Sequence, residues 1–299
     1  MTRVSSSTLR GQLLADEKLA KYTSWRVGGI AKQMYIPADK RDLTQFITSL
    51  SKNEQIFWLG LGSNLLVRDG GIIGTVVNTR GKLKELALLD NDHIYVECGV
   101  PCAHVARFCA ENGLIGAEFL AGIPGTMGGA IKMNAGAFGG ETWRLIASIE
   151  TISVGGELVQ HASNEFIVAY RHVEGLHNDC ILSANLRLKQ GNSQEVQQKI
   201  KKLLAQRSES QPTNQPTCGS VFKNPEDDYA ARLIEVSGLK GYTIGGAQVS
   251  QKHANFIVNT GEATAQDIEQ LIEYVQQTVD KQQGITLQTE VCIVGEALA

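Results

Sequence analysis

With 299 residues, a mass of 32.4 kDa and 42% hydrophobic residues, the chain is too long for one compact core and too apolar for disorder, so we expect two or three domains. Its net charge of -3 argues against a nucleic-acid-binding protein or one that binds anionic membranes. No apolar run approaches the roughly 20 residues of a transmembrane helix, and the N-terminus lacks the apolar region of a signal peptide, so we expect an intracellular, multi-domain protein.

The first 190 residues predict a mixture of helices and strands. Residues 1–20 are polar, and we expect them to form a loosely packed lead-in. Residues 42–53 have the apolar spacing of an amphipathic helix, and Pro101 opens another helix that ends before Gly113. Short apolar runs bounded by turns predict strands over 55–60, 71–79, 83–89, 93–99, 148–154, 156–162 and 180–190.

The last third of the chain predicts a separate domain. A helix over 193–207 is followed by SESQPTNQPTCG at 208–219, which has the Ser, Pro and Asn content of a linker. Beyond this boundary we expect a strand at 255–259, a final strand over about 285–295, and helices over 229–237 and 264–282.

The cysteines and histidines do not indicate a metal site. The six cysteines include no C-x-x-C pair, and the six histidines are scattered. We therefore expect reduced thiols and no bound metal.

Two glycine-rich segments are candidates for holding a phosphate. Gly60–Asn64 begins like a dinucleotide fingerprint, but Leu65 takes the place of the third glycine and an extended stretch follows. On its own this motif is more typical of a tight turn. The nineteen residues from Gly122 to Gly140 contain seven glycines and no Walker sequence, and a loop of that length without secondary structure is usually functional.

Glycines let backbone N–H groups face a ligand without an intervening side chain. Four neutral hydrogen-bonding side chains accompany the two segments, namely Ser63, Asn64, Thr126 and Asn134. The combination favours a dinucleotide cofactor that is held without a Walker lysine.

A set of motifs in chain order carries a resemblance to a known family: TSWRVGG at 23–29, GLGSNLLV at 60–67, EFLAGIPGTMGGAIKMNAGAFG at 118–139, YRHV at 170–173, CGSVFKNP at 218–225, LIEVSGLKGYTIGGAQVSQKHANFIVN at 233–259 and LQTEV at 287–291. From about Tyr22 to Gly295 the chain resembles the UDP-N-acetylenolpyruvoylglucosamine reductases, the MurB family of flavoenzymes of bacterial peptidoglycan precursor synthesis. Several motifs in order are far more specific than any one of them.

The resemblance implies an α+β fold. It has a two-subdomain FAD-binding region of the vanillyl-alcohol oxidase type and a smaller C-terminal α/β substrate-binding domain. We assign residues 1–80 and 81–207 to the two FAD-binding subdomains and residues 208–299 to the substrate-binding domain. The last strand, about 285–295, then returns Glu290 to the active site.

One branch of the family carries an insertion with a substrate-capping tyrosine between its catalytic arginine and serine. Ser220 follows Arg171 by only 49 positions here, with a single predicted helix between them. The chain therefore resembles the shorter branch.

The reaction implied by the resemblance is the reduction of UDP-N-acetylglucosamine enolpyruvate to UDP-N-acetylmuramate, with non-covalent FAD as cofactor and NADPH as co-substrate. A hydride goes to C3 of the enol ether and a proton to C2. The resemblance implies three catalytic residues: Arg171 for the substrate carboxylate, Ser220 as proton donor, and Glu290 to stabilise the developing charge. By their local sequence alone they are more typical of a surface arginine, a turn serine, and a carboxylate that is ion-paired or at a strand edge.

The resemblance also implies the binding residues. FAD is expected to contact Gly60, Gly62, Ser63, Asn64, Leu65, Gly122, Ile123, Pro124, Gly125, Thr126, Gly128, Gly129, Asn134 and Gly136. The substrate is expected to contact Lys223, Asn224, Gln248, His253 and Asn255. Cys218 is expected to be mainly structural, because no second cysteine or adjacent histidine accompanies it. The expected partners are these small molecules alone, with a monomeric protein in the cytoplasm.

Two alternatives stay open at this point. One is a flavin-dependent oxidase of the same fold that acts on an alcohol or sugar. Many of those attach flavin through a histidine near the glycine-rich loop, and this chain has no histidine between His104 and His161. The other is a non-catalytic protein that binds a nucleotide sugar, which would be colourless and would not take up FAD.

Overall fold

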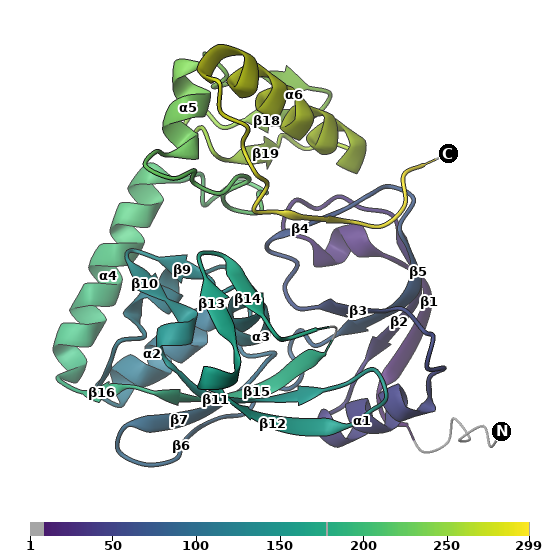
Figure 1. Ribbon diagram of the computed structural model, residues 1–299, viewed down its shortest axis with the longest axis vertical. Helices are drawn as coiled ribbons and strands as arrows, with labels where there is room; N and C mark the ends of the chain where they lie inside the picture. The colour runs from purple at the N-terminus through teal and green to yellow at the C-terminus, as the bar shows by residue number, and fades with distance from the viewer. Residues whose placement is uncertain (1–8, 178, 299) are drawn as a thin grey trace. The chain divides into compact units, whose positions relative to one another are not determined.

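The computed structural model describes residues 9–177 and 179–298. The chain forms two compact units, each built from separated stretches (Figure 1). The first unit consists of Met1–Leu14, Gln33–Gly60 and Gly74–Ala205, and the second of Ala15–Lys32, Leu61–Ile73 and Gln206–Ala299. No helix in these described ranges is long and apolar enough to cross a bilayer.

A four-stranded sheet has the order β1-β2-β5-β3, with strands Gln12–Lys18, Ile30–Ile36, Ile72–Asn78 and Ile56–Leu59. The chain passes from one unit to the other within β1, β2 and β5. The expectation of a loosely packed lead-in is wrong from Gln12 onward, because β1 pairs in this sheet; residues 1–8 lie outside the described residues.

The central sheet of the first unit is antiparallel throughout, in the order β12-β11-β15-β7-β6. Its strands are Leu158–Ala162, Ile146–Ile152, Cys180–Arg187, His93–Glu97 and Leu86–Leu88. Helices α2 (Cys102–Glu111) and α3 (Met127–Lys132) contribute to the apolar core that covers one face of this sheet (Figure 1). Pro101 precedes α2 and Gly113 follows it with φ +65, as the sequence predicted.

The remaining elements of the first unit are short, apart from α1 (Lys40–Ser49) and most of α4 (Ser193–Ser210). Three pairs of very short strands complete it: β8 (Leu114–Ile115) with β16 (Lys189–Gln190), β9 (Gly136–Ala137) with β10 (Gly140–Glu141), and β13 (Ile167–Ala169) with β14 (His172–Glu174).

The second unit has an antiparallel sheet in the order β17-β18-β19 (Thr243–Ile244, Ala247–Val249 and Ile257–Asn259), with helices α5 (Ala230–Val236) and α6 (Ala265–Gln283). The apolar stripe predicted for the long helix is buried at Ile268, Leu271, Ile272, Val275 and Val279. Strand β4 (Leu65–Val67) pairs in parallel with β20 (Cys292–Val294), although the two are far apart in the sequence.

The prediction of a strand over 285–295 is only partly correct. Regular pairing is confined to Cys292–Val294, and Thr289 makes an isolated bridge to Phe222. Glu290 therefore lies between the bridge and the strand, half-buried and outside regular structure. The alternation of apolar and polar residues predicted extended backbone correctly, but it could not show where the partner strand ends.

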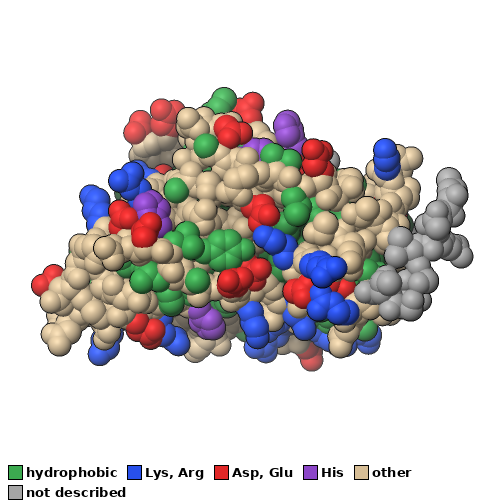
Figure 2. Space-filling model, turned by 90° about the horizontal axis from the view of Figure 1, so that it is seen from below, with side chains coloured by type: hydrophobic (Ala, Val, Ile, Leu, Met, Phe, Trp, Pro, Cys, Tyr) green, Lys and Arg blue, Asp and Glu red, His purple; other side chains and the backbone are tan. Residues whose placement is uncertain are grey.

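Charged side chains of both signs are interspersed on the face of the molecule in Figure 2. This mixture agrees with the chain's 28 basic and 31 acidic residues.

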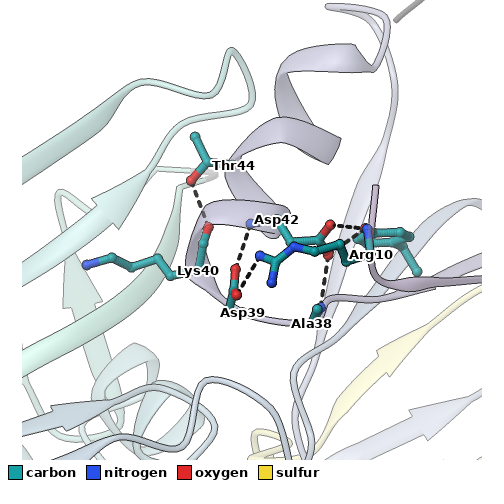
Figure 3. A network of polar contacts seen from close by, with 7 residues as sticks. Arg10, Ala38, Asp39, Lys40, Asp42 and Thr44 are labelled. Atoms are coloured by element: carbon teal, nitrogen blue, oxygen red, sulfur yellow. Dashed lines mark hydrogen bonds and ion pairs between the residues drawn. The ribbon is translucent and has the colours of Figure 1, made fainter. Parts of the chain in front are cut away.

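A buried carboxylate joins the start of the described chain to α1 (Figure 3). Asp42 is fully buried and accepts hydrogen bonds from the Tyr35 hydroxyl at 2.6 Å and from the backbone N–H groups of Arg10 at 2.7 Å and Ala38 at 2.9 Å. Burial alone would raise the pKa of Asp42, but these hydrogen bonds outweigh burial and hold the pKa below its usual range. Asp39 caps the same helix by accepting from the N–H of Asp42.

We expect Asp42→Asn to destabilise the protein by about 1.5–3 kcal/mol at pH 7, because hydrogen bonds to a charged group are lost. The folded-state pKa of Asp42 is depressed, so its stabilisation is complete above the unfolded pKa of about 3.9 and is lost as the pH falls through the folded value. Urea unfolding of both proteins at pH 7 and near pH 3 measures this difference.

The control is Asp16→Asn, which removes only an exposed contact to Lys32 at 3.3 Å and should change stability by less than about 1 kcal/mol. An Asp42→Asn penalty that stays constant between the two pH values would contradict the assignment.

Candidate active site

Arg171 occupies the turn of the hairpin between β13 and β14. The last strand pair before the turn is Ala169 with His172, so Tyr170 and Arg171 form a two-residue connection. The φ of Arg171 is +52, in the left-handed region that favours glycine. A non-glycine residue there costs roughly 1–2 kcal/mol, and such strain is concentrated at functional sites.

The guanidinium of Arg171 holds the glycine-rich segment by its carbonyl groups. It donates to the carbonyl of Gly136 at 2.8 Å and to that of Asn134 at 3.4 Å, and it lies 4.9 Å from the centroid of the Tyr170 ring. The hairpin and the glycine-rich segment therefore fix each other's position within the first unit. Arg171 lies more than thirty positions after Asn134 and Gly136 in the sequence, and no motif predicted their contact.

Asn134 makes the reciprocal contact. It is buried, with φ +45, and its amide donates to the carbonyl of Ala169 at 3.1 Å while its side-chain oxygen accepts from the N–H of Trp143 at 3.1 Å. Asparagine tolerates the left-handed conformation better than most residues. Both arms of the side chain serve the protein, and so does the backbone N–H, which donates to the carbonyl of Ile131 at 3.2 Å.

The segment from Gly122 to Gly140 is not the structureless loop that the sequence predicted. It follows a 3-10 helix (Glu118–Gly122) and contains α3 and β9. At the start of α3 the N–H groups of Met127 and Gly128 donate to the carbonyls of Val100 and Cys98, each at 2.9 Å. These two amides therefore bind the protein instead of forming an open anion nest.

The adjacent glycines 128 and 129 differ in what surrounds them. A Cβ at Gly128 would lie 2.8 Å from the Cβ of Cys98, so this glycine permits close packing. A Cβ at Gly129 would meet nothing within 4 Å, and Gly129 is exposed. The first turn of a helix leaves its N–H groups without helical partners. The open backbone at Gly129 therefore fits a ligand with hydrogen-bond acceptors, such as a dinucleotide.

The two glycine-rich segments meet within the first unit. A Cβ at Gly60 would come 2.7 Å from the hydroxyl of Thr126, so only glycine allows this approach. Gly122 is similarly covered, by the ring of Phe138. Ile123 and Pro124 lead toward α3, and the carbonyl of Gly125 accepts from the N–H of Cys102 at 2.9 Å.

The rest of the Gly60–Asn64 motif belongs to the second unit. Gly62 has φ +58, and a Cβ there would lie 2.1 Å from the carbonyl oxygen of Tyr22. Ser63 and Asn64 follow, and Leu65 begins β4. The side-chain amide of Asn64 donates to the backbone carbonyl of Glu290 at 3.0 Å. The backbone carbonyl of Asn64 accepts from the N–H of Cys292 at 3.1 Å. The motif thereby helps to hold the backbone at Glu290 and at Cys292.

Ser220 lies in an irregular segment between two buried residues, Cys218 and Val221. Gly219 has φ +80, which turns the chain there. Within the described residues the Ser220 hydroxyl makes no hydrogen bond to the backbone of its own turn, unlike the turn serine that its local sequence suggested. Ser220 is half-buried.

Cys218 is structural. Its thiol contacts the carbonyl of Leu65 at 3.4 Å and that of Gly62 at 3.6 Å. Burial raises the pKa of the Cys218 thiol to about 12, so the group stays protonated and unreactive at neutral pH.

The residues after Ser220 pair with the segment that contains Glu290. The N–H of Glu290 donates to the carbonyl of Val221 at 2.7 Å, and the N–H of Lys223 donates to the carbonyl of Gln288 at 2.9 Å. The bridge between Phe222 and Thr289 lies between these two bonds. The second unit thus brings together two of the three predicted catalytic residues, which are seventy positions apart in the sequence.

The five predicted substrate-binding residues have different surroundings. Lys223 is half-buried beside the Ser220 segment, whereas the side-chain oxygen of Asn224 accepts from the N–H of Ala230 at the start of α5. Gln248 on β18 donates to the hydroxyl of Thr243 at 3.2 Å.

His253 and Asn255 serve the interior of the second unit. The ring of His253 packs edge-on against Phe256 at 4.7 Å, and burial lowers its pKa. Asn255 is buried and hydrogen-bonds the backbone of Phe222. Lys223 follows the serine by three positions, and its backbone N–H is held by Gln288.

Comparisons with known proteins agree with this architecture. A family model described as "UDP-N-acetylenolpyruvoylglucosamine reductase, C-terminal domain" matches residues 211–294, and one described as "FAD binding domain" matches residues 31–162. The second match includes Gly60 and the whole Gly122–Gly140 segment. The first includes Ser220 and Glu290.

Similar whole proteins have the same description. The UDP-N-acetylenolpyruvoylglucosamine reductase of Methylococcus capsulatus is 58% identical over 290 residues, covering 97% of this chain and 95% of the relative. That of Nitrosococcus oceani is 53% identical and covers 99% of both chains. The crystal structure of the reductase (MurB) from Thermus caldophilus superposes with a TM-score of 0.82 at 30% identity, covering 95% of this chain and 99% of the other.

Proposed function

The chain belongs to the UDP-N-acetylenolpyruvoylglucosamine reductase family, and on this premise we propose that Arg171, Ser220 and Glu290 carry out its chemistry. It is an FAD-dependent oxidoreductase of peptidoglycan precursor synthesis. It reduces UDP-N-acetylglucosamine enolpyruvate to UDP-N-acetylmuramate with NADPH as co-substrate. When bound, FAD would supply the hydride chemistry that links NADPH to C3 of the enol ether.

The residues of the chain have to manage the negative charge that this reaction creates at C2 and in the adjacent carboxylate. Preorganised positive charge and hydrogen-bond donors stabilise such charge most effectively. Arg171 has a permanently charged guanidinium whose planar fork matches a carboxylate. We assign it to the substrate carboxylate. Its contacts to the carbonyls of Gly136 and Asn134 support this role because they fix the orientation of the guanidinium.

Ser220 gives its hydroxyl proton to C2. A serine is a weak acid, but a carbanion-like acceptor is basic enough to take its proton, and the resulting alkoxide regains a proton from water or a neighbouring group. The protonated carboxyl of Glu290 donates a hydrogen bond to the same developing charge. The observation that carries the assignment is the backbone pairing of the Ser220 segment with the Glu290 segment, with the N–H of Glu290 bound to Val221 at 2.7 Å.

We also propose that the two glycine-rich segments hold FAD without a covalent bond. The backbone of Gly129, Gly60 with Thr126, and the motif Gly62–Leu65 are the principal contacts, with Gly122–Gly125 and Gly136 completing the set. Gly128 and Asn134 contribute by packing and by hydrogen bonds within the protein. For the substrate, Lys223 is the first candidate, and Asn224, Gln248 and His253 are secondary.

The domain boundaries, the branch of the family and the oligomeric state are also proposed from membership of the family. The division into residues 1–80, 81–207 and 208–299 is proposed by analogy with the family, with residues 15–32 and 61–73 contributing to the C-terminal unit. Between Arg171 and Ser220 the described chain forms β14, β15, β16 and the single helix α4, which supports membership of the shorter branch. We propose a cytoplasmic monomer, and light scattering should give a mass close to 32.4 kDa.

Ser220→Ala should leave the loss of flavin absorbance on NADPH addition within about twofold of wild type, because that step needs no proton at C2. Recovery of absorbance on adding the enolpyruvyl substrate should slow by about 10²–10⁴-fold, the usual effect of removing a positioned proton donor. Glu290→Gln should slow the same step, with a smaller loss if the carboxyl acts mainly as a hydrogen-bond donor. Stopped-flow spectroscopy separates the two steps.

Ser237→Ala is the matched control, since Ser237 is a buried serine of the same unit whose hydroxyl contacts only Gln283 among the described residues. If Ser220→Ala slows both steps equally, the serine shapes the flavin pocket and the assigned role is wrong.

The neighbouring glycines of α3 test the cofactor assignment. Gly129→Ala should fold normally and gain up to about 1 kcal/mol of helix stability, but the added methyl group should raise the FAD dissociation constant by at least about tenfold, equivalent to 1.4 kcal/mol. Gly128→Ala should instead destabilise the protein even without FAD, because its Cβ would press on Cys98.

Flavin fluorescence titration gives the dissociation constant, and thermal unfolding of the FAD-free protein gives the stability. If Gly129→Ala binds FAD as tightly as wild type does, Gly129 is not part of the cofactor site.

A further inference from the structure

We propose that Asn255 is a positioning residue that holds Ser220 in place for proton transfer. The inference rests on the proposed role of Ser220 and goes beyond it. Ser220 belongs to no helix or strand, so something other than regular structure must fix its segment. Among the described residues, the hydrogen bonds that hold it from one side come from Asn255.

Asn255 binds the two residues that follow Ser220 with three hydrogen bonds. Its backbone carbonyl accepts from the N–H of Val221 at 2.9 Å. Its side-chain oxygen accepts from the N–H of Phe222 at 2.9 Å, and its side-chain amide donates to the carbonyl of Phe222 at 2.8 Å. The carboxamide thus makes the pair of bonds that a neighbouring strand would make with Phe222.

The opposite side of the same segment is bound by the residues around Glu290. The carbonyl of Val221 accepts from the N–H groups of Glu290 at 2.7 Å and Val291 at 3.3 Å. The segment after Ser220 therefore lies between Asn255 and the Glu290 segment, in the manner of a central strand. Loss of either side would let Ser220 move relative to Glu290.

The geometry separates this role from substrate binding. Asn255 is 4% exposed and Phe222 is 2% exposed, so the three hydrogen bonds are sheltered from water. Both arms of the carboxamide are directed at the backbone of one residue, Phe222. A buried amide in this position is costly to remove, because the N–H and carbonyl of Phe222 lose their partners.

The expected consequence is kinetic. A proton donor acts only within hydrogen-bond reach of the atom that it protonates, at about 2.6–3.2 Å, and misplacement by about 1 Å can cost on the order of 10²-fold. Displacing Ser220 should therefore slow the substrate step, whereas the NADPH step has no need of this hydroxyl.

The experiment compares Asn255→Ala with wild type as FAD-loaded enzymes. Recovery of flavin absorbance with the enolpyruvyl substrate should slow by at least about tenfold, and the NADPH step should change by less than about twofold. Hydrogen–deuterium exchange of the peptide 218–223 should accelerate, because the N–H of Phe222 loses its acceptor. Asn255→Asp keeps that acceptor but replaces the donor to the carbonyl with a carboxylate oxygen, so it should also slow the substrate step more than the NADPH step, and it serves if the alanine variant does not fold.

Asn259→Ala is the matched control. Asn259 is also a buried asparagine of the second unit, and its side chain binds the backbone of Trp25, Gly261 and Ala263, not the Ser220 segment. It should lose comparable stability while both kinetic steps stay close to wild type.

A double variant decides whether Asn255 acts through the serine. In Ser220→Ala, the additional change Asn255→Ala should slow the substrate step by less than about twofold, since the donor to be positioned is already absent. Independent, multiplicative losses would overturn the positioning role. So would an equal slowing of the two steps in Asn255→Ala, or an equal effect in Asn259→Ala. If Ser220→Ala itself recovers absorbance at the wild-type rate, the proposed function fails instead.

Discussion

The peptide groups of Val221 are the point on which the proposed chemistry of the second unit depends. The Val221 N–H binds Asn255, and its carbonyl binds Glu290. Ser220 is the preceding residue, so these bonds set the place of the hydroxyl and of the carboxylate together. The carboxylate's own segment is held in turn by Asn64, whose amide donates to the Glu290 carbonyl. Backbone hydrogen bonds can therefore fix the relative positions of the Ser220 and Glu290 side chains, although neither residue lies in a helix or strand.

In the first unit, the charged residue Arg171 is held in a different way. Arg171 has a left-handed backbone conformation in the turn, and so does Asn134, one of the two residues whose carbonyls accept from its guanidinium. The two residues exchange contacts between the hairpin and the glycine-rich segment, since Asn134 donates to Ala169 beside the turn. Strain of this kind persists only where surrounding contacts impose it. The arginine is therefore coupled to the segment that we assign to FAD, and changes in one are expected to affect the other.

Local signals in the sequence predicted much of the fold. The spacing of Ile268, Leu271 and Ile272 indicated the long helix, which runs from Ala265 to Gln283, and the Pro101 and Gly113 boundaries of α2 were correct within one or two residues. The α+β class and the family followed from the motifs. Where the sequence failed, the missing information was tertiary. β1 is polar at many positions yet pairs in a sheet, and Glu290 follows an isolated bridge instead of lying inside a strand.

The site residues show the same limit. Glycine density indicated the segments that we assign to FAD, but it could not distinguish Gly128, which packs on Cys98, from the open Gly129. Asn134 and Asn255 were expected to face ligands because asparagine is polar and lies within the motifs. Both prove to be buried and bonded to backbone groups at least nine positions away. A single sequence does not reveal such partners, because neither periodicity nor spacing encodes which distant peptide group an amide will meet.

We propose that Ser220 and Glu290, held by one set of backbone bonds, serve the same proton transfer. A double-mutant cycle of Ser220→Ala and Glu290→Gln, measured on the substrate step by flavin absorbance, distinguishes joint from separate action. Groups that act as a unit are strongly non-additive, so the double variant should be slower than the slower single variant by no more than about threefold. Losses that multiply would show instead that the two residues act independently.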